Sequence, residues 1–338
     1  MQLQYCLETI NKSCEKHCWP NSIRIPMYVF MISTILATMA GNLAVIISIA
    51  HFKQLHTPTN YLILSMATVD FLLGCLVMPY SMVRSVENCW YFGDIFCKIH
   101  TGTDIMLSTA SIFHLSFISV DRYYAVCDPL RYKAKINKFT VLVMILTSWV
   151  IPAIFAFGMI FLELNIKGSE ILFYNEVYCV GGCFVFFSET SGIIASMLSF
   201  FIPGFVMICI YGKIYLIARR QARLIKDATN QIQFQANFIK SHTSRCRERK
   251  AAKTLGTIMG VFLICWMPIF VTLLIDPFMN FSTPKVIFEV FNWFSYINST
   301  CNPILYGFLY PWFRKGLKHI ISGKICYSDA CANLFPAE

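Results

Sequence analysis

The chain has 338 residues, of which 57% are hydrophobic and only 14% are charged, and its mean hydropathy is +0.58. In soluble domains roughly a quarter of the residues are charged, so this composition excludes an ordinary soluble protein and favours a membrane protein. The net charge of +10 lies mostly in short segments between long apolar runs, which is typical of membrane topology. We therefore predict no nucleic-acid partner.

Seven apolar stretches are long enough to cross a lipid bilayer. A hydrocarbon core about 30 Å thick requires about 20 helical residues, and helices satisfy their own backbone hydrogen bonds inside lipid. The sequence therefore predicts an all-α membrane protein, a seven-transmembrane helix bundle. The predicted spans are residues 25–52, 54–83, 99–120, 139–162, 190–212, 254–275 and 290–313.

Lys and Arg are distributed unequally between the two sides of this bundle. With the N-terminus outside, 21 of the 28 basic residues fall in the inner segments and the C-terminal tail, as the positive-inside rule expects. We therefore expect an extracellular N-terminus at residues 1–24 and the seven-helix domain at 25–310. Residues 311–338 begin with apolar and basic residues at helical spacing, which predicts a short amphipathic eighth helix on the inner leaflet, followed by a cytoplasmic tail.

Several cysteines and two glycosylation sequons are expected on the outer side, where disulfides persist. The sequons begin at Asn11, the expected glycosylation site, and at Asn280. Seven outer cysteines are an odd number, so at least one stays unpaired or pairs between chains. In the tail, Cys326 and Cys331 are either palmitoylated or free thiols. The outer cysteines are Cys6, Cys14, Cys18, Cys89, Cys97, Cys179 and Cys183.

Asp104 interrupts the third apolar run, and an ionisable residue inside a span is a functional hypothesis because its burial is costly. It lies about 10 Å below the outer end of that span, within reach of a ligand. No Lys or Arg of a neighbouring span is an obvious partner, so a protonated amine from solution would neutralise it. Aromatic residues that attract ammonium groups include Trp266, Phe270 and Trp293. The alternative is an aspartate hydrogen-bonded to Tyr296 or to other hydroxyls.

Asp70 interrupts the second apolar run, near its middle. Ser111 is expected at a similar depth on the third span, and Asn298 and Asn302 share one face of the seventh. Hard cations prefer oxygen ligands, so these four residues form either a site for a sodium ion with water or a waterless hydrogen-bond network. No other metal and no cofactor are expected.

The sequence Asp121-Arg122-Tyr123 lies at the inner end of the third span, about 27 Å along the helix from Asp104. Glu248, at the inner end of the sixth span, is a candidate partner for Arg122. Breaking such a pair would let the sixth helix move and open an inner cleft. The alternative is two unconnected interfacial charges.

An ordered set of motifs, one per span, resembles the rhodopsin-like G-protein-coupled receptors over nearly the whole chain. Asp104 matches the amine receptors of that family. The run 298–313 is similar to the fingerprint of the trace amine-associated receptors, and residues 121–135 most resemble the first subtype of that group. The motifs are Gly41-Asn42, Asp70, Asp121-Arg122-Tyr123, Trp149, Pro203, Cys265-Trp266-Met267-Pro268 and Asn302-Pro303-Ile304-Leu305-Tyr306.

The resemblance implies a multi-pass receptor of the plasma membrane, not an enzyme, that binds a small protonated amine. It also implies coupling to a heterotrimeric G protein of the stimulatory type, which raises cyclic AMP. One alternative is a serotonin-like or other monoamine receptor. An alternative of another class is a membrane transporter or channel for amines.

The resemblance also implies a ligand pocket in which Asp104 anchors the ammonium and Trp266 senses the depth of the ligand. Ala195 stands where diamine-sensing relatives carry a second carboxylate, so we expect monoamines to be preferred over diamines. Ile269 stands where amine receptors usually have Phe. The expected pocket residues are Arg84, His100, Asp104, Ser108, Phe186, Phe187, Ser196, Ser199, Trp266, Ile269, Phe270, Asn292 and Tyr296.

The remaining implied roles concern coupling and disulfides. The residues expected to couple to the G protein or to switch are Asp121, Arg122, Tyr123, Pro129, Leu130, Glu248 and Tyr306. The implied disulfides are Cys97–Cys183, Cys6–Cys179 and Cys14–Cys89, which leaves Cys18 over.

Overall fold

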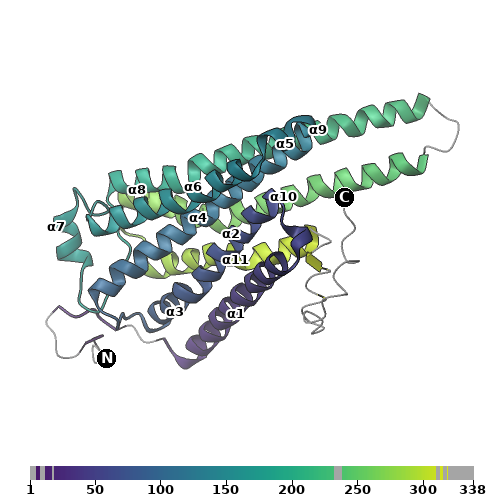
Figure 1. The fold of residues 1–338 in the computed structure, drawn as a ribbon. Helices are drawn as coiled ribbons and strands as arrows, with labels where there is room; N and C mark the ends of the chain where they lie inside the picture. Colours follow the sequence, from purple (N-terminus) through teal and green to yellow (C-terminus); the bar gives the residue numbers. More distant parts are fainter. Residues whose placement is uncertain are drawn as a thin grey trace.

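The computed structural model describes residues 5–7, 12–16, 19–231, 238–309, 313–314 and 318. This part of the chain is almost entirely helical, and its long helices lie alongside one another in one elongated bundle (Figure 1). The long helices are α1 (Asn21–His51), α2 (Pro58–Leu76) with α3 (Met78–Glu87), α4 (Asp94–Cys127), α6 (Lys138–Phe161), α8 (Glu189–Ser196) with η3 (Met197–Phe201) and α9 (Ile202–Gln231), α10 (Phe238–Ile275) and α11 (Lys285–Leu309).

These helices confirm the predicted all-α bundle and correspond one to one with the seven predicted spans. Six helical segments are long and apolar enough to cross a membrane: Asn21–His51, Pro58–Glu87, Asp94–Cys127, Lys138–Phe161, Glu189–Ile217 and Thr257–Met279. The seventh, α11, is a 25-residue helix packed against α1, α2 and α10. Its buried face carries the polar residues Ser295, Asn298, Ser299 and Asn302.

Prolines shape the helices around the outer half of the bundle. Pro79 is the second residue of α3, which begins at Met78 directly after Val77, and the second span is interrupted there between α2 and α3. Pro203 lies two residues after a π-helical turn, η3, which carries Ser199. A π-turn inserts an extra residue and changes which side chains face inward, and such turns often occur at functional sites.

Close approach of two helices depends on a glycine at one point of the bundle. A Cβ added to Gly41 on α1 would lie 3.0 Å from the Pro303 side chain on α11. The missing side chain therefore lets α1 and α11 pack closely at the depth of the polar residues of α11.

The loops contain short helices that the apolar pattern did not predict. On one side of the bundle, α5 (Pro129–Lys135) begins with a proline, which suits the first helical position because its missing N–H would be unpaired there. On the opposite side lie α7 (Glu170–Leu172), η2 (Phe173–Val177) and η4 (Asp276–Met279). Figure 1 shows α9 and α10 extending past the other helices at the end opposite α7.

Three disulfides close the end of the bundle that carries α7. Cys97 is bonded to Cys183, as the resemblance implied. The other two implied pairs, Cys6–Cys179 and Cys14–Cys89, are wrong. The structure pairs Cys6 with Cys89 and Cys14 with Cys179.

The backbone explains this exchange of partners. Ser13 forms a parallel bridge with Val180, and the Cys14 N–H donates to the Val180 carbonyl at 2.9 Å, which brings Cys14 beside Cys179. The Cys6 N–H donates to the Cys14 carbonyl at 2.9 Å. All four cysteines are therefore neighbours, and only the register of this short bridge decides which of them pair.

Some predicted features fall outside the part of the chain that the structure describes. They are Cys18, the sequon at Asn11, and residues 311–338 of the predicted amphipathic helix and tail, apart from Phe313, Arg314 and Lys318.

Peptide mapping of the unreduced protein should recover peptides that link Cys6 with Cys89 and Cys14 with Cys179. The Cys6→Ser, Cys89→Ser double variant should retain the Cys14–Cys179 link, because the Ser13–Val180 bridge does not depend on Cys6. Recovery of Cys6–Cys179 and Cys14–Cys89 peptides from the wild type would contradict the structure. Mass spectrometry of the proteolysed protein measures both.

Candidate functional site

A cavity of about 260 Å³ lies between the helices at the end of the bundle that carries the disulfides. Its walls come from α4, η3, α10 and α11, and Val177 of η2 and the loop residues 183–187 contribute a roof. Most of the predicted pocket residues line it: Arg84, Asp104, Ser108, Phe186, Phe187, Ser199, Trp266, Ile269, Phe270 and Asn292.

Asp104 is the carboxylate in the wall of this cavity, and its side chain is only 8% exposed. The Tyr296 hydroxyl donates to Oδ2 at 2.7 Å, and the Ser108 hydroxyl donates to Oδ1 at 3.3 Å. The predicted hydrogen bond to Tyr296 is therefore present. Both donors are neutral, and none of the ion pairs among the described residues involves Asp104, so its negative charge is not balanced there.

Arg84 lines the same cavity but is already paired. Its Nε donates to Glu289 Oε1 at 2.9 Å, and the Ser85 hydroxyl also donates to Glu289. The pair cancels the charge of a buried guanidinium, so Arg84 is not required as the counter-ion of Asp104. Glu289 was not predicted as a site residue. Its position two turns before Tyr296, on the same face of α11, is the signal that identifies it.

Aromatic side chains enclose the cavity from below and above. Trp266 and Phe270 belong to α10, and their ring centroids are 5.9 Å apart. Phe270 in turn stacks on Phe200, with centroids 4.8 Å apart. In the roof, Phe186 packs against Phe281, with centroids 4.7 Å apart. Phe281 was not predicted, because it lies in a loop rather than in a span.

Three predicted pocket residues do not line the cavity: His100, Ser196 and Tyr296. Tyr296 contributes indirectly, because its hydroxyl donates a hydrogen bond to Asp104 and accepts one from the Asn292 side-chain amide at 2.9 Å. Ser196 is buried, and its hydroxyl has no hydrogen-bond partner within the described structure.

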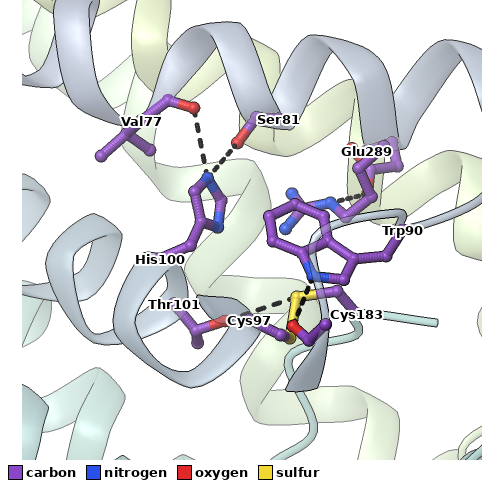
Figure 2. Close-up of a disulfide and its surroundings, with 10 residues drawn as sticks. Val77, Ser81, Trp90, Cys97, His100, Thr101, Cys183 and Glu289 are labelled. Atoms are coloured by element: carbon purple, nitrogen blue, oxygen red, sulfur yellow. Dashed lines mark hydrogen bonds and ion pairs between the residues drawn. A yellow bond between two sulfur atoms is a disulfide. The ribbon is translucent and has the colours of Figure 1, made fainter. Parts of the chain in front are cut away.

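His100 lies beside the disulfide that ties the loop to α4, as Figure 2 shows. Its Nε2 hydrogen-bonds to the Val77 carbonyl at 3.2 Å, and its ring centroid lies 5.1 Å from that of Trp90. Next to it, Thr101 lies 3.9 Å from Cys183 Sγ. His100 therefore supports the outer wall rather than contacting the cavity.

A second polar cluster surrounds Asp70, which is fully buried. The Ser111 and Ser299 hydroxyls donate to Oδ1 at 3.0 and 2.7 Å, and the Asn302 amide donates to Oδ2 at 2.7 Å. The cluster therefore joins α2, α4 and α11. Ser299 was not predicted, and the Asn298 amide nitrogen, although buried, has no hydrogen-bond partner in the part of the protein described.

The inner end of α4 carries a network centred on Asp121, which is also fully buried. Arg122 Nε donates to Asp121 Oδ2 at 2.8 Å, and the Tyr132 hydroxyl donates to Oδ1 at 3.0 Å. Thr59 bonds to both carboxylate and guanidinium. Burial raises the pKa of Tyr132, which keeps this phenol protonated and able to donate.

The structure describes the side chains of only some of the other residues that were predicted to switch or to couple to the G protein. Tyr123 lies half-buried on α4, and Pro129 and Leu130 begin α5 with Leu130 97% exposed. The side chains of Glu248 and Tyr306 lie outside the described residues, so the predicted Arg122–Glu248 pair stays a prediction.

Comparison with known proteins identifies the family. The sequence model described as "7 transmembrane receptor (rhodopsin family)" matches residues 41–306. Trace amine-associated receptor 1 of Macaca mulatta is 63% identical over 97% of each chain, and that of Homo sapiens is 61% identical over 97% of this chain and 96% of its own. Trace amine-associated receptor 4 of Mus musculus is 52% identical over 100% of this chain and 97% of its own. This is a family of receptors, which confirms that the chain is not an enzyme. The chain therefore belongs to the trace amine-associated receptors, within the rhodopsin family of seven-transmembrane receptors.

Proposed function

We propose that this chain is a plasma-membrane receptor for small protonated amines, with an extracellular N-terminus, that signals through a stimulatory heterotrimeric G protein to raise cyclic AMP. The observation that carries the proposal is the carboxylate of Asp104, which lies in an aromatic cavity and is paired with no cation among the described residues. The relatives' name, trace amine-associated receptors, supports an amine as the ligand.

The two oxygens of Asp104 have different neighbours. Oδ2 is held by the short bond from Tyr296, whereas Oδ1 has only the longer bond from Ser108. An ammonium group therefore finds its best acceptor at Oδ1, where it forms a charge-assisted hydrogen bond. Phe270 and Trp266, which line the cavity, then pack against the apolar part of the ligand.

A hydroxyl group on the fifth transmembrane segment favours a ring-hydroxylated aromatic amine among the possible ligands. Ser199 lines the cavity, whereas Ser196 is buried away from it and has no hydrogen-bond partner within the described structure. Ala195 also lines the cavity and offers no charge. A short diamine would leave its second ammonium beside this apolar wall, so monoamines are favoured over short diamines.

Signalling requires that the ligand change the inner end of the bundle. The indole N–H of Trp266 is buried and has no hydrogen-bond partner in the described chain, so no such bond opposes its rotation when a ligand contacts it. Trp266 precedes Pro268, where α10 lacks one backbone hydrogen bond and bends easily. We propose that this bend moves the inner end of α10 away from Arg122 and exposes a cleft for the G protein.

The exposed apolar side chain of Leu130 supports α5 as the docking site for the G protein. Leu130 is 97% exposed at the start of this short helix, on the side opposite the disulfides. A side chain this exposed is available for contact with a partner protein at this end of the bundle.

The orientation is supported by the three disulfides, which all lie at one end of the bundle. Disulfides persist outside the cell, whereas most Lys and Arg residues lie toward the other end.

We also propose a sodium ion at Asp70. The surrounding oxygen donors suit a hard cation, and the unpaired amide of Asn298 offers a further ligand if its oxygen is turned inward. An ion held between α2, α4 and α11 would oppose movement of these helices.

Asp104→Asn should lower the potency of aromatic monoamines by roughly 10- to 100-fold, the value of a hydrogen bond to a charged group. Cyclic AMP in transfected cells measures potency. The matched control is Ser108→Ala, which keeps the charge and should have a smaller effect. Antibody binding to an N-terminal epitope on unpermeabilised cells checks surface expression and orientation together. An Asp104→Asn receptor with wild-type potency would remove Asp104 from the anchoring role.

Leu130→Asp should abolish most of the cyclic AMP response while amine binding persists, because it places a charge in the proposed G-protein interface. Displacement of a labelled amine from membranes measures binding separately. Phe139→Asp is the control for an exposed apolar residue, 73% exposed at the start of α6 beside the same loop. Equal losses in both variants, or loss of amine binding with Leu130→Asp, would argue against the docking role.

Replacing sodium by a large organic cation in membrane assays should raise agonist affinity in the wild type. The reason is that an ion bound between α2, α4 and α11 stabilises the inactive state of the receptor. Asp70→Asn should remove this dependence on sodium. Ser116→Ala, which loses only a hydroxyl bonded to its own helix, should keep it. A sodium effect that survives Asp70→Asn would place the ion elsewhere.

A further inference from the structure

The cavity that contains Asp104 has a second buried carboxylate that the proposed function does not use. Asp276 begins η4, is only 8% exposed and lines the cavity. Its Oδ1 accepts the backbone N–H of Thr283 at 3.0 Å. No ion pair among the described residues involves Asp276, so its charge is as unbalanced there as that of Asp104.

The other charged residues of the cavity are accounted for. Arg84 and Glu289 form an ion pair with each other. Lys285 also lines the cavity, but its Nζ lies 3.8 Å from the centre of the Phe184 ring and forms a cation–π contact rather than an ion pair with Asp276. Lys285 is therefore the one competing cation near the mouth that the described residues supply.

The two unbalanced carboxylates lie at different depths. Asp276 directly follows α10, ten residues beyond Trp266, whereas Asp104 lies ten residues, about 15 Å, below the start of α4 at Asp94. We therefore expect the two carboxylates to be separated by about 10 to 15 Å along the bundle. Phe281 and Phe186 line the same cavity and pack against each other, which adds aromatic surface to it.

We infer that Asp276 is a second cation subsite, which binds the distal ammonium of an elongated diamine whose first ammonium is held by Asp104. The inference rests on the proposed amine function, and it limits the preference for monoamines that was expected from Ala195 to short diamines. A short diamine does not reach Asp276 and leaves its second charge beside Ala195. A long diamine satisfies both carboxylates.

A structural role for Asp276 can be separated from this binding role. The bond from the Thr283 N–H closes the loop after α10 and needs only an oxygen acceptor at position 276. Asp276→Asn keeps that acceptor and removes the charge. A structural role would therefore leave this variant unchanged or weaken all ligands alike.

The test compares linear α,ω-diaminoalkanes of increasing length with n-alkylamines of the same length, using cyclic AMP potency and displacement binding. In the wild type, the diamine should gain about tenfold over its matched monoamine at lengths that span both carboxylates, and nothing at short lengths. Asp276→Asn should abolish this gain and leave monoamine potency within about twofold. Lys285→Met, which removes the competing cation, should increase the gain.

Each contrary outcome has a distinct meaning. A wild type in which no diamine exceeds its monoamine would overturn the subsite, and so would an equal effect of Asp276→Asn on both ligand series. Asp276→Asn with the full diamine gain would likewise overturn it. If monoamines fail to act through Asp104 at all, the proposed amine function is wrong and the subsite falls with it.

Discussion

The proposed ligand site depends on one buried carboxylate, Asp104, that has no counter-ion among the described residues. Asp104 is stabilised by two neutral hydroxyl donors, Tyr296 and Ser108, which lower the cost of burying the anion but do not cancel it. Arg84 lines the same cavity and would be attracted to that anion if it were free. Glu289 prevents this by pairing with Arg84 from the adjacent helix. In the proposed function, Glu289 thus leaves Asp104 available to a cation from solution without contacting it.

Three aspartates in this membrane protein have three different structural roles, which follow from the groups that contact them. Asp121 is joined to a guanidinium, so its charge is compensated within the inner network. Asp70 accepts three uncharged donors from two other helices and acts as a polar junction. Asp104 accepts two donors and faces a cavity. The residue type is the same at all three positions, but the charged partners, the depth and the number of hydrogen-bond donors differ. These differences distinguish the ion pair of Asp121 from the polar junction at Asp70 and from the proposed ligand site at Asp104.

Much of this arrangement could be predicted from the sequence, because apolar runs and the charges that interrupt them are local properties. The seven spans and both mid-span carboxylates were found in this way. Asp276 and Glu289 were not predicted as site residues because each lies just beyond the end of an uncharged run. Charged residues at such ends were expected to belong to the loops. Ser196 was misplaced because regular helical spacing put it one turn from Ser199, whereas the π-turn at Met197–Phe201 changes the register between them. His100 shares a helix face with Asp104, but Val77 and Trp90 hold its ring against the outer wall. The disulfide partners depend on the register of a loop bridge, which has no sequence signature.

The paired disulfides at the outer end have a consequence for the speed of recognition. Cys179 is bonded to Cys14 and Cys183 to Cys97, so the loop is fixed on both sides of the three residues that separate them, Val180, Gly181 and Gly182. The roof residues Phe184 to Phe187 follow directly. Because the two disulfides restrain this roof, it has lost most of its conformational freedom before any ligand binds. Ligand binding therefore loses no affinity to the entropy cost of ordering the roof. The same stiffness narrows the route by which a ligand leaves, and it favours long residence over rapid exchange.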